Sequence, residues 1–141
     1  MFDVLNLVEI ENILWNYTVS QIDDLCVKYG IGRSGIKQDK IKKIVNFYSK
    51  ENLIEDAYYN QNEYEREMTI NLVHYKFNPT YESVKEIKNK YPKVGDKNYE
   101  IFFIGKYIPV TIQKKLENLV PKLEIIFNSV LNIDLEDEYA Y

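Results

Sequence analysis

The spacing of apolar and polar positions divides the chain into a helical first part and a mixed second part. Between residues 3 and 16, apolar side chains recur every three or four positions, the spacing of one face of a helix. Thr18 followed by Gln21 is a capping-box pattern, so a second helix should begin at Val19. Gly30 is well placed to end that helix in a left-handed conformation. The inward positions of this second helix are Val19, Ile22, Leu25 and Cys26.

A third helix should follow, with Ser34 placed to cap its start and its end between Ser49 and Asn52. None of these helices is long enough to be stable alone, so each needs the others to bury its apolar side. We therefore expect the three helices to share one small core. The inward positions of the third helix are Ile41, Ile44, Val45 and Tyr48.

The second half of the chain is mixed in type. Residues 55–66 are polar and rich in tyrosine, which fits a weak helix or a connector, and residues 81–90 have the spacing of a short helix. Residues 99–104 are aromatic and β-branched and predict a strand. A turn could return the chain into residues 107–110, where Pro109 restricts that partner to an edge. A small β-hairpin is therefore expected.

The last third has the longest amphipathic pattern. Apolar side chains keep helical spacing from Ile112 to Leu131, and Pro121 should kink or split the helix. Such a stripe can be part of the core or the contact surface for a protein partner or a homodimer, and the sequence leaves both open. The acidic tail that follows is either a solvated end or a competitor for a basic surface. Its acidic residues are Asp134, Glu136, Asp137 and Glu138.

These patterns predict a mainly α fold in three parts. Residues 1–52 should form an N-terminal helical bundle that contains a helix–loop–helix, and residues 53–77 a connector or helix. Residues 78–141 should form an α+β region with the small β-hairpin and the long amphipathic helix.

Positive charge gathers in the first of these parts. Between Thr18 and Lys50 there are seven basic and three acidic residues, a net of +4, while the whole chain carries −4. A local basic surface on an acidic chain can still bind nucleic acid, because salt screens repulsion beyond about 8–10 Å. The helix–loop–helix is therefore the place where a phosphate backbone would bind.

The same stretch resembles a known family. Over 27 of the 141 residues, from Thr18 to Ile44, it is similar to the SAP-type helix–extension–helix module, a small DNA-binding motif. Two positions depart from the family pattern: Lys40 stands where a leucine is usual, and Lys43 replaces the usual arginine. The matching segments are Thr18-Val19, Ile22, Leu25-Cys26, Gly30-Ile31, Ser34-Gly35-Ile36-Lys37 and Lys43-Ile44.

The resemblance implies a small protein that binds double-stranded DNA along its phosphate backbone. The DNA-binding residues implied are Lys28, Arg33, Ser34, Gly35, Lys37, Lys40 and Lys43. In the simplest alternative, these lysines are only the solvated side of an ordinary helical hairpin. Another is a protein-interaction or inhibitory factor, of the kind that mobile elements carry, which acts through an acidic or aromatic surface.

Composition narrows the remaining possibilities. No apolar run reaches the roughly 18 residues needed to span a membrane, and the N-terminus lacks the pattern of a signal peptide. The single cysteine, Cys26, cannot form an internal disulfide and fits a core position, so a reducing, cytoplasmic setting is the expectation. The thirteen tyrosines we attribute to a compositional bias of the genome.

Catalytic patterns are weak, and the sequence leaves open whether the protein is an enzyme. One histidine, His74, and one cysteine cannot supply a His/Cys zinc cluster, and the chain has no phosphate-binding glycine-rich motif. Glu86 and Lys88 have a spacing seen in metal-dependent nucleases, but no acidic partner stands out. We expect no cofactor and no metal, and a nuclease is a weaker hypothesis than a binding protein.

Overall fold

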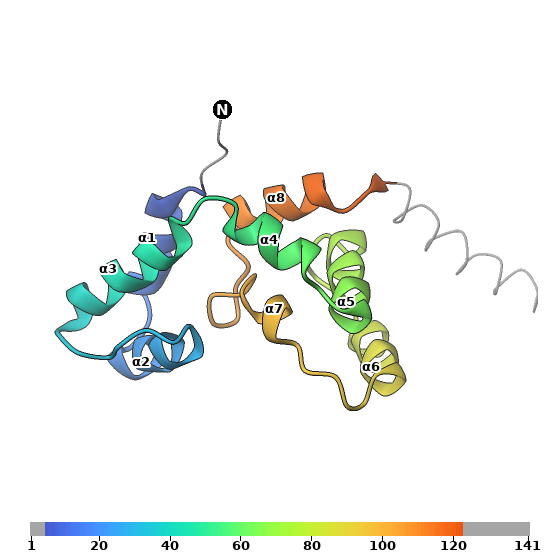
Figure 1. The fold of residues 1–141 in the computed structure, drawn as a ribbon, viewed down its shortest axis with the longest axis horizontal. Coiled ribbons are helices and arrows are strands. Elements are labelled where there is room, and N and C mark those ends of the chain that lie inside the picture. Colours follow the sequence, from blue (N-terminus) through green and yellow to red (C-terminus); the bar gives the residue numbers. More distant parts are fainter. Residues whose placement is uncertain (1–4, 123–141) are drawn as a thin grey trace, which may run out of the picture.

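The computed structural model describes residues 5–122, which form eight helices and no regular strand (Figure 1). The predicted mainly α fold is confirmed. The helices are α1 (Leu7–Trp15), α2 (Val19–Lys28), α3 (Lys37–Tyr48), α4 (Leu53–Tyr59), α5 (Glu63–His74), α6 (Tyr81–Lys90), α7 (Lys97–Glu100) and α8 (Val110–Leu119).

The first three helices pack as the apolar pattern predicts. α3 contacts both α1 and α2, and the side chains between them are fully excluded from solvent. Val19 differs from the prediction: it is the first residue of α2 and its side chain is 46% exposed. The side chains with no exposed surface are Ile10, Leu14, Ile22, Cys26, Ile41, Ile44 and Tyr48.

The ends of α2 also follow the sequence. The Gln21 amide donates to the Thr18 hydroxyl at 3.2 Å, and the Thr18 amide donates to the Gln21 side chain at 2.8 Å. This reciprocal capping box satisfies two backbone donors that a helix start leaves without partners. Gly30 follows α2 with φ of +69°, the left-handed conformation that glycine adopts without a steric penalty.

The middle of the chain is more regular than its sequence indicates. The tyrosine-rich residues predicted as a weak helix or connector fall in two helices, α4 and α5, which meet at a turn. Tyr58 and Tyr64 are buried there, so the tyrosines carry part of the core. α6 has the predicted bounds and packs on α5.

The predicted β-hairpin is wrong. In place of a strand, residues 97–100 form the short helix α7, and one isolated bridge joins Ile104 to Tyr107. Phe102 and Ile104 are fully buried, as their apolar character requires. The backbone around them finds hydrogen-bond partners in side chains from the first three helices and the turns that join them, so this segment needs no partner strand.

α8 begins against α1. The Glu9 carboxylate accepts hydrogen bonds from the amides of Val110 and Thr111, at 2.8 and 2.9 Å. In return the Thr111 hydroxyl accepts from the Asn6 amide at 2.9 Å. A carboxylate at this position satisfies the first amides of α8 and is favoured by the helix dipole.

α8 ends before Pro121, as expected of a proline. Its inward residues Ile112, Leu116 and Val120 are buried in the core of the chain, which favours the core interpretation for this part of the predicted Ile112–Leu131 stripe. The rest of that stripe and the acidic tail lie outside the described residues.

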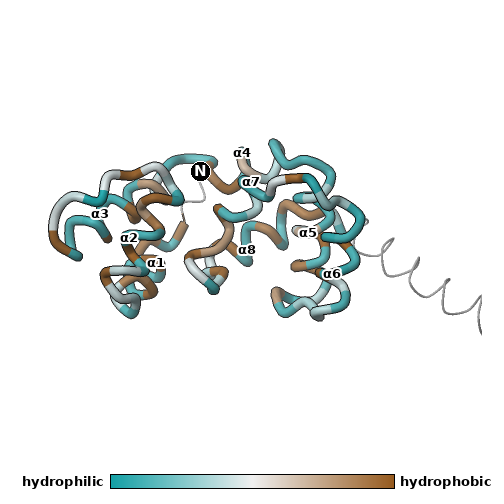
Figure 2. The backbone as a smooth tube through the Cα atoms, turned by 90° about the horizontal axis from the view of Figure 1, so that it is seen from below, coloured by the Kyte–Doolittle hydropathy of each residue, from teal (hydrophilic) through white to brown (hydrophobic). Residues whose placement is uncertain are grey.

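The helices form an elongated arch. α1, α2 and α3 lie at one end of the long axis and α5 and α6 at the other, with α4 and α8 between them (Figures 1 and 2). One continuous cluster of apolar side chains runs from Leu5 to Val120. Within residues 5–122, none of the helices has both the length and the apolar character needed to cross a membrane.

Candidate nucleic-acid interface

The loop between α2 and α3 is shaped by glycine and by one aspartate. Gly35 has φ of +99°, and a Cβ at this position would lie 2.9 Å from the Asp39 side chain. Asp39 occupies that space because its carboxylate accepts a hydrogen bond from the Ile36 amide at 3.2 Å. A residue larger than glycine would therefore displace the carboxylate that fixes the start of α3.

The start of α3 has no side-chain cap. Ile36, not Ser34, holds the N-cap position, so the predicted Ser34 cap is wrong. The isoleucine side chain has no hydrogen-bond acceptor, and the amides of Lys37, Gln38 and Asp39 have no acceptor among the described residues. Unsatisfied first-turn amides and the positive end of the helix dipole together attract anions.

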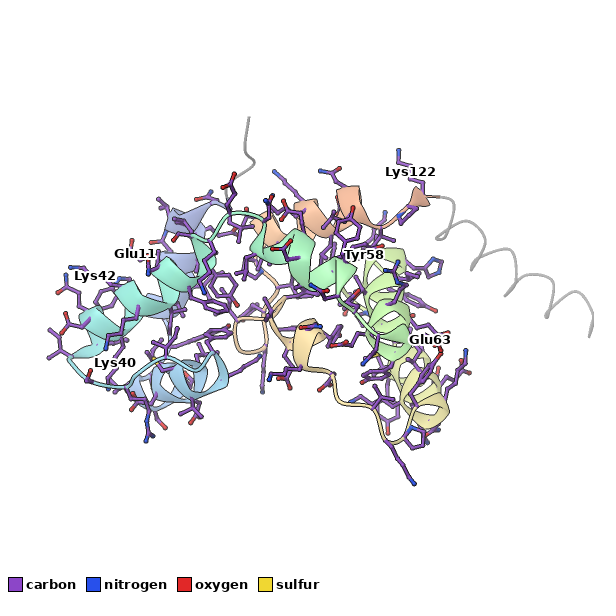
Figure 3. The ribbon with its side chains drawn as sticks, in the orientation of Figure 1. Glu11, Lys40, Lys42, Tyr58, Glu63 and Lys122 are labelled. Atoms are coloured by element: carbon purple, nitrogen blue, oxygen red, sulfur yellow. The ribbon has the colours of Figure 1, made fainter. Side chains whose placement is uncertain are left out.

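Two of the predicted DNA-binding lysines hold the hairpin together. The Lys43 ammonium donates to the Ser34 hydroxyl at 3.0 Å and to its carbonyl at 3.2 Å, which ties the loop to α3. The Lys40 ammonium lies 2.8 Å from the Asp23 carboxylate and joins α3 to α2 (Figure 3). The Lys40 side chain is only 10% exposed, so we leave it out of the candidate interface.

Two further lysines, Lys28 and Lys37, flank the loop, but their side chains have other neighbours. The Lys37 ammonium donates to the Trp15 carbonyl at 3.2 Å and sits 5.5 Å from the centre of the Trp15 ring. Partial burial lowers the pKa of Lys28, and the nearby carboxylates of Glu100 and Asp96 oppose that shift. The seven residues implied by the family resemblance therefore do not form one cationic patch.

Three cations act electrostatically on Cys26. Burial raises the pKa of the Cys26 thiol and Asp23 adds to the increase, while Lys40, Lys43 and Arg33 all act to lower that pKa. Of these three cations, Arg33 is exposed and has no hydrogen bond or ion pair with any described residue. The candidate interface therefore consists of the Arg33 guanidinium, the Lys43–Ser34 contact and the first-turn amides of α3.

A different feature joins this hairpin to the rest of the protein, and sequence reasoning missed it. Tyr17, Tyr29 and Tyr48, which we call the tyrosine clasp, donate hydroxyl protons to backbone carbonyls of the segment that was predicted as a strand. Tyr17 donates to the Ile104 carbonyl at 2.5 Å, Tyr29 to that of Phe103 at 3.2 Å and Tyr48 to that of Ile101 at 2.9 Å.

The Tyr29 and Tyr48 side chains of the clasp are largely excluded from solvent. The Tyr29 and Tyr48 hydroxyl oxygens lie 2.5 Å apart, and the Phe47 ring stacks on Tyr29 with centroids 4.7 Å apart. Burial raises the pKa of Tyr29 to about 12, and it raises that of Tyr48 well above its ordinary value. The inward position of Tyr48 was predictable from helical spacing, but no local signal identifies the distant carbonyl that it contacts.

The side chains that the sequence offered for metal binding or nuclease activity do not form a metal site within residues 5–122. In residues 5–122, no three histidine, cysteine, aspartate or glutamate side chains approach closely enough to hold a metal ion. Glu86 and Lys88, which have the spacing seen in nucleases, both lie on α6 and are exposed. An open hollow between α1 and α3 is lined by Leu7, Val8 and Val45 and by the charged residues Glu11 and Lys42, which Figure 3 labels.

No family model, curated protein or solved structure matches this chain. A functional assignment therefore depends on the geometry of the hairpin and on its sequence pattern.

Proposed function

We propose that the α2–α3 hairpin is a SAP-like module that binds double-stranded DNA through its phosphate backbone. The observation that supports this most strongly is the uncapped start of α3 next to the exposed Arg33. A phosphate at this position would accept hydrogen bonds from the amides of Lys37 and Gln38 and from the guanidinium. Arginine pairs well with phosphate because its planar donors match two phosphate oxygens.

Apart from Asp39, whose carboxylate accepts from the Ile36 amide, the start of α3 offers no side-chain acceptor to its first-turn amides. Serine, threonine, aspartate or asparagine at an N-cap stabilises a helix by about 1 kcal/mol over an aliphatic residue. Here that position is Ile36, which is 67% exposed and therefore gains little from burial. An incoming phosphate would supply the missing acceptor.

The experiment that tests this proposal gives the helix its own cap. Ile36→Asp places a carboxylate where a phosphate would bind, so α3 should be more stable by roughly 0.5–2 kcal/mol while duplex affinity falls. Arg33→Gln should lower affinity without changing stability. We expect each variant to lose at least about fivefold in affinity for a 20-base-pair duplex at 50 mM salt, because a charge-assisted phosphate contact is removed.

Lys114→Gln is the matched control, because it removes one positive charge at an exposed site on α8. Fluorescence anisotropy gives the affinities, and urea unfolding gives the stabilities. Opposite changes in affinity and stability for Ile36→Asp cannot come from misfolding. Wild-type affinity in both interface variants would contradict the proposal. A folded wild type that retains no duplex would make the protein-interaction hypothesis the better one.

A further inference from the structure

A second basic surface lies on α6, which is at the far end of the arch from the hairpin (Figures 1 and 2). In a helix of 3.6 residues per turn, Tyr81, Lys85 and Lys88 fall on one side, within one narrow stripe. Glu82 and Glu86 fall on the adjacent side, with Glu82 three positions before Lys85. The two signs of charge are thus sorted onto different sides of the same short helix.

The stripe points away from the body of the protein. The inward side of α6 contains Val84 and Ile87, which are half-buried, and Ser83, whose hydroxyl accepts from the Asn71 side chain of α5 at 3.0 Å. Lys90 anchors the end of the helix through a 2.9 Å contact with Glu67. Tyr81, by contrast, is 80% exposed, the largest value among the exposed large hydrophobic side chains of the described chain.

Nothing within the described chain balances the charge of this stripe. Lys85 and Lys88 are exposed and form no hydrogen bond or ion pair with any residue between 5 and 122. Lys88 lies in the last turn of α6, where the helix dipole favours a cation, and Lys85 lies three positions after Glu82. These effects do not give either ammonium group a hydrogen bond or an ion pair within the described chain. The Tyr81 ring beside these lysines is 80% exposed, so little of its apolar surface is buried in the fold.

Charge along the chain separates the stripe from the hairpin. Residues 76–97 contain six lysines and three acidic residues, a net of +3. Residues 51–75, which lie between the two basic regions in sequence, contain six acidic residues and one arginine, a net of −5. The protein therefore has two basic regions with an acidic region between them in sequence. The net charge of −4 for the whole chain does not reveal either basic region.

We propose that Tyr81, Lys85 and Lys88 form a second contact surface for nucleic acid, separate from the α2–α3 hairpin. The two ammonium groups pair with backbone phosphates, and the Tyr81 ring packs on an adjacent sugar or base. Lysines interleaved with an exposed aromatic ring are the combination that such contacts use. The choice of nucleic acid as the ligand rests on the proposed function of the hairpin, whereas the sorted and unpaired charge stands on its own.

The test neutralises the stripe without disturbing the helix. Lys85→Gln with Lys88→Gln keeps the fold, because glutamine and lysine have similar helix propensities. Lys106→Gln with Lys114→Gln is the matched control, since it removes the same charge at two other exposed sites. Affinity for a 40-base-pair duplex is measured by anisotropy between 50 and 200 mM salt for the full chain.

We expect the stripe variant to lose about tenfold in affinity at the lowest salt and to reduce the slope of log affinity against log salt by about 2, because two phosphates are no longer neutralised. The control should leave both values near those of the wild type. A stripe variant that matches the control overturns the inference. If the stripe variant weakens binding while Arg33→Gln and Ile36→Asp do not, the inference stands and the proposed role of the hairpin fails.

Discussion

The α2–α3 hairpin and the segment from residue 97 to 109 reach their conformations in different ways. In the hairpin, α2 begins at a capping box made by Thr18 and Gln21 and ends at Lys28, two residues before the left-handed Gly30, so residues at its own ends set its bounds. In the 97–109 segment, backbone groups bond to side chains tens of residues away. Local patterns therefore determine the first region, and long-range hydrogen bonds determine the second.

Glu65 shows how the second region is held. Its side chain is buried, and one carboxylate oxygen accepts from the Asn62 amide at 3.0 Å to cap α5. The other oxygen accepts from the amides of Asn98 and Tyr99, at 2.6 and 3.1 Å, and so fixes the start of α7. One side chain thus satisfies two helix starts that are distant in sequence.

Removing that carboxylate should have the largest effect of the changes considered. Glu65→Ala leaves three partly buried amides without an acceptor, and we expect a loss of roughly 2–4 kcal/mol in the free energy of unfolding. Urea denaturation measures it. Glu63→Ala, at an exposed site on the same helix, should change stability by no more than about 0.5 kcal/mol. Equal losses in the two variants would mean that the distant contacts do not hold α7.

The tyrosine clasp should have the next largest effect. Tyr48→Phe keeps the buried ring but leaves the Ile101 carbonyl without its hydroxyl donor, which should cost about 1–3 kcal/mol of unfolding free energy. The exposed Tyr59 gives a matched Tyr59→Phe control, for which we expect no measurable change. Calorimetric melting of both variants compares them. A clasp variant as stable as its control would show that the carbonyls find other donors.

Alkaline pH should lower the free energy of unfolding by a smaller amount than the Tyr48→Phe substitution. Because burial raises the pKa of Tyr29 to about 12, its hydroxyl is neutral in both folded and unfolded chains below pH 10. Above about pH 10 the unfolded chain loses that proton first, so the stabilisation is lost progressively as the pH rises toward about 12. We expect about 1 kcal/mol of loss at pH 10.5 from this group. Urea midpoints of wild type and Tyr29→Phe at pH 8 and 10.5 test it, and an equal loss in both would contradict the account.

Loss of the Thr18 cap at the start of α2 should have the smallest effect on the free energy of unfolding. Thr18→Ala removes the hydroxyl that accepts from the Gln21 amide and should cost about 1 kcal/mol or less. Because this cap is made by neighbours in sequence, hydrogen exchange should speed up in α2 while the amides of Asn98 and Tyr99 stay protected. Faster exchange at both sites would show that the two regions are not set independently.

The same contrast explains what could be predicted from the sequence. Helical spacing found α6 with its bounds and most of the buried residues of α2 and α3, because that signal lies within one element. It placed the exposed Val19 inside and did not find the buried Lys40. The strand prediction for residues 99–104 failed because aromatic and β-branched residues indicate burial, not the partner of the backbone. Glu9, Glu65 and Tyr29 act across the fold, and nothing near them in sequence identifies their partners.

In the candidate site, too, the sequence identified residues but not their long-range contacts. The glycines and cations of the loop were identified from sequence, but the roles of the lysines were not. Lys40 pairs with Asp23, and Lys37 contacts Trp15, because α1, α2 and α3 meet at this corner. A basic residue count could not separate these structural lysines from Arg33, which remains exposed.

The salt dependence of duplex binding by the wild-type chain tests the central claim most directly. Contacts from Arg33, the start of α3 and the α6 stripe should neutralise several phosphates, and each adds about −0.9 to the slope of log affinity against log salt. We therefore expect a slope steeper than about −2 between 50 and 200 mM salt. A flat response, or no retention of duplex DNA at 50 mM salt, would contradict it.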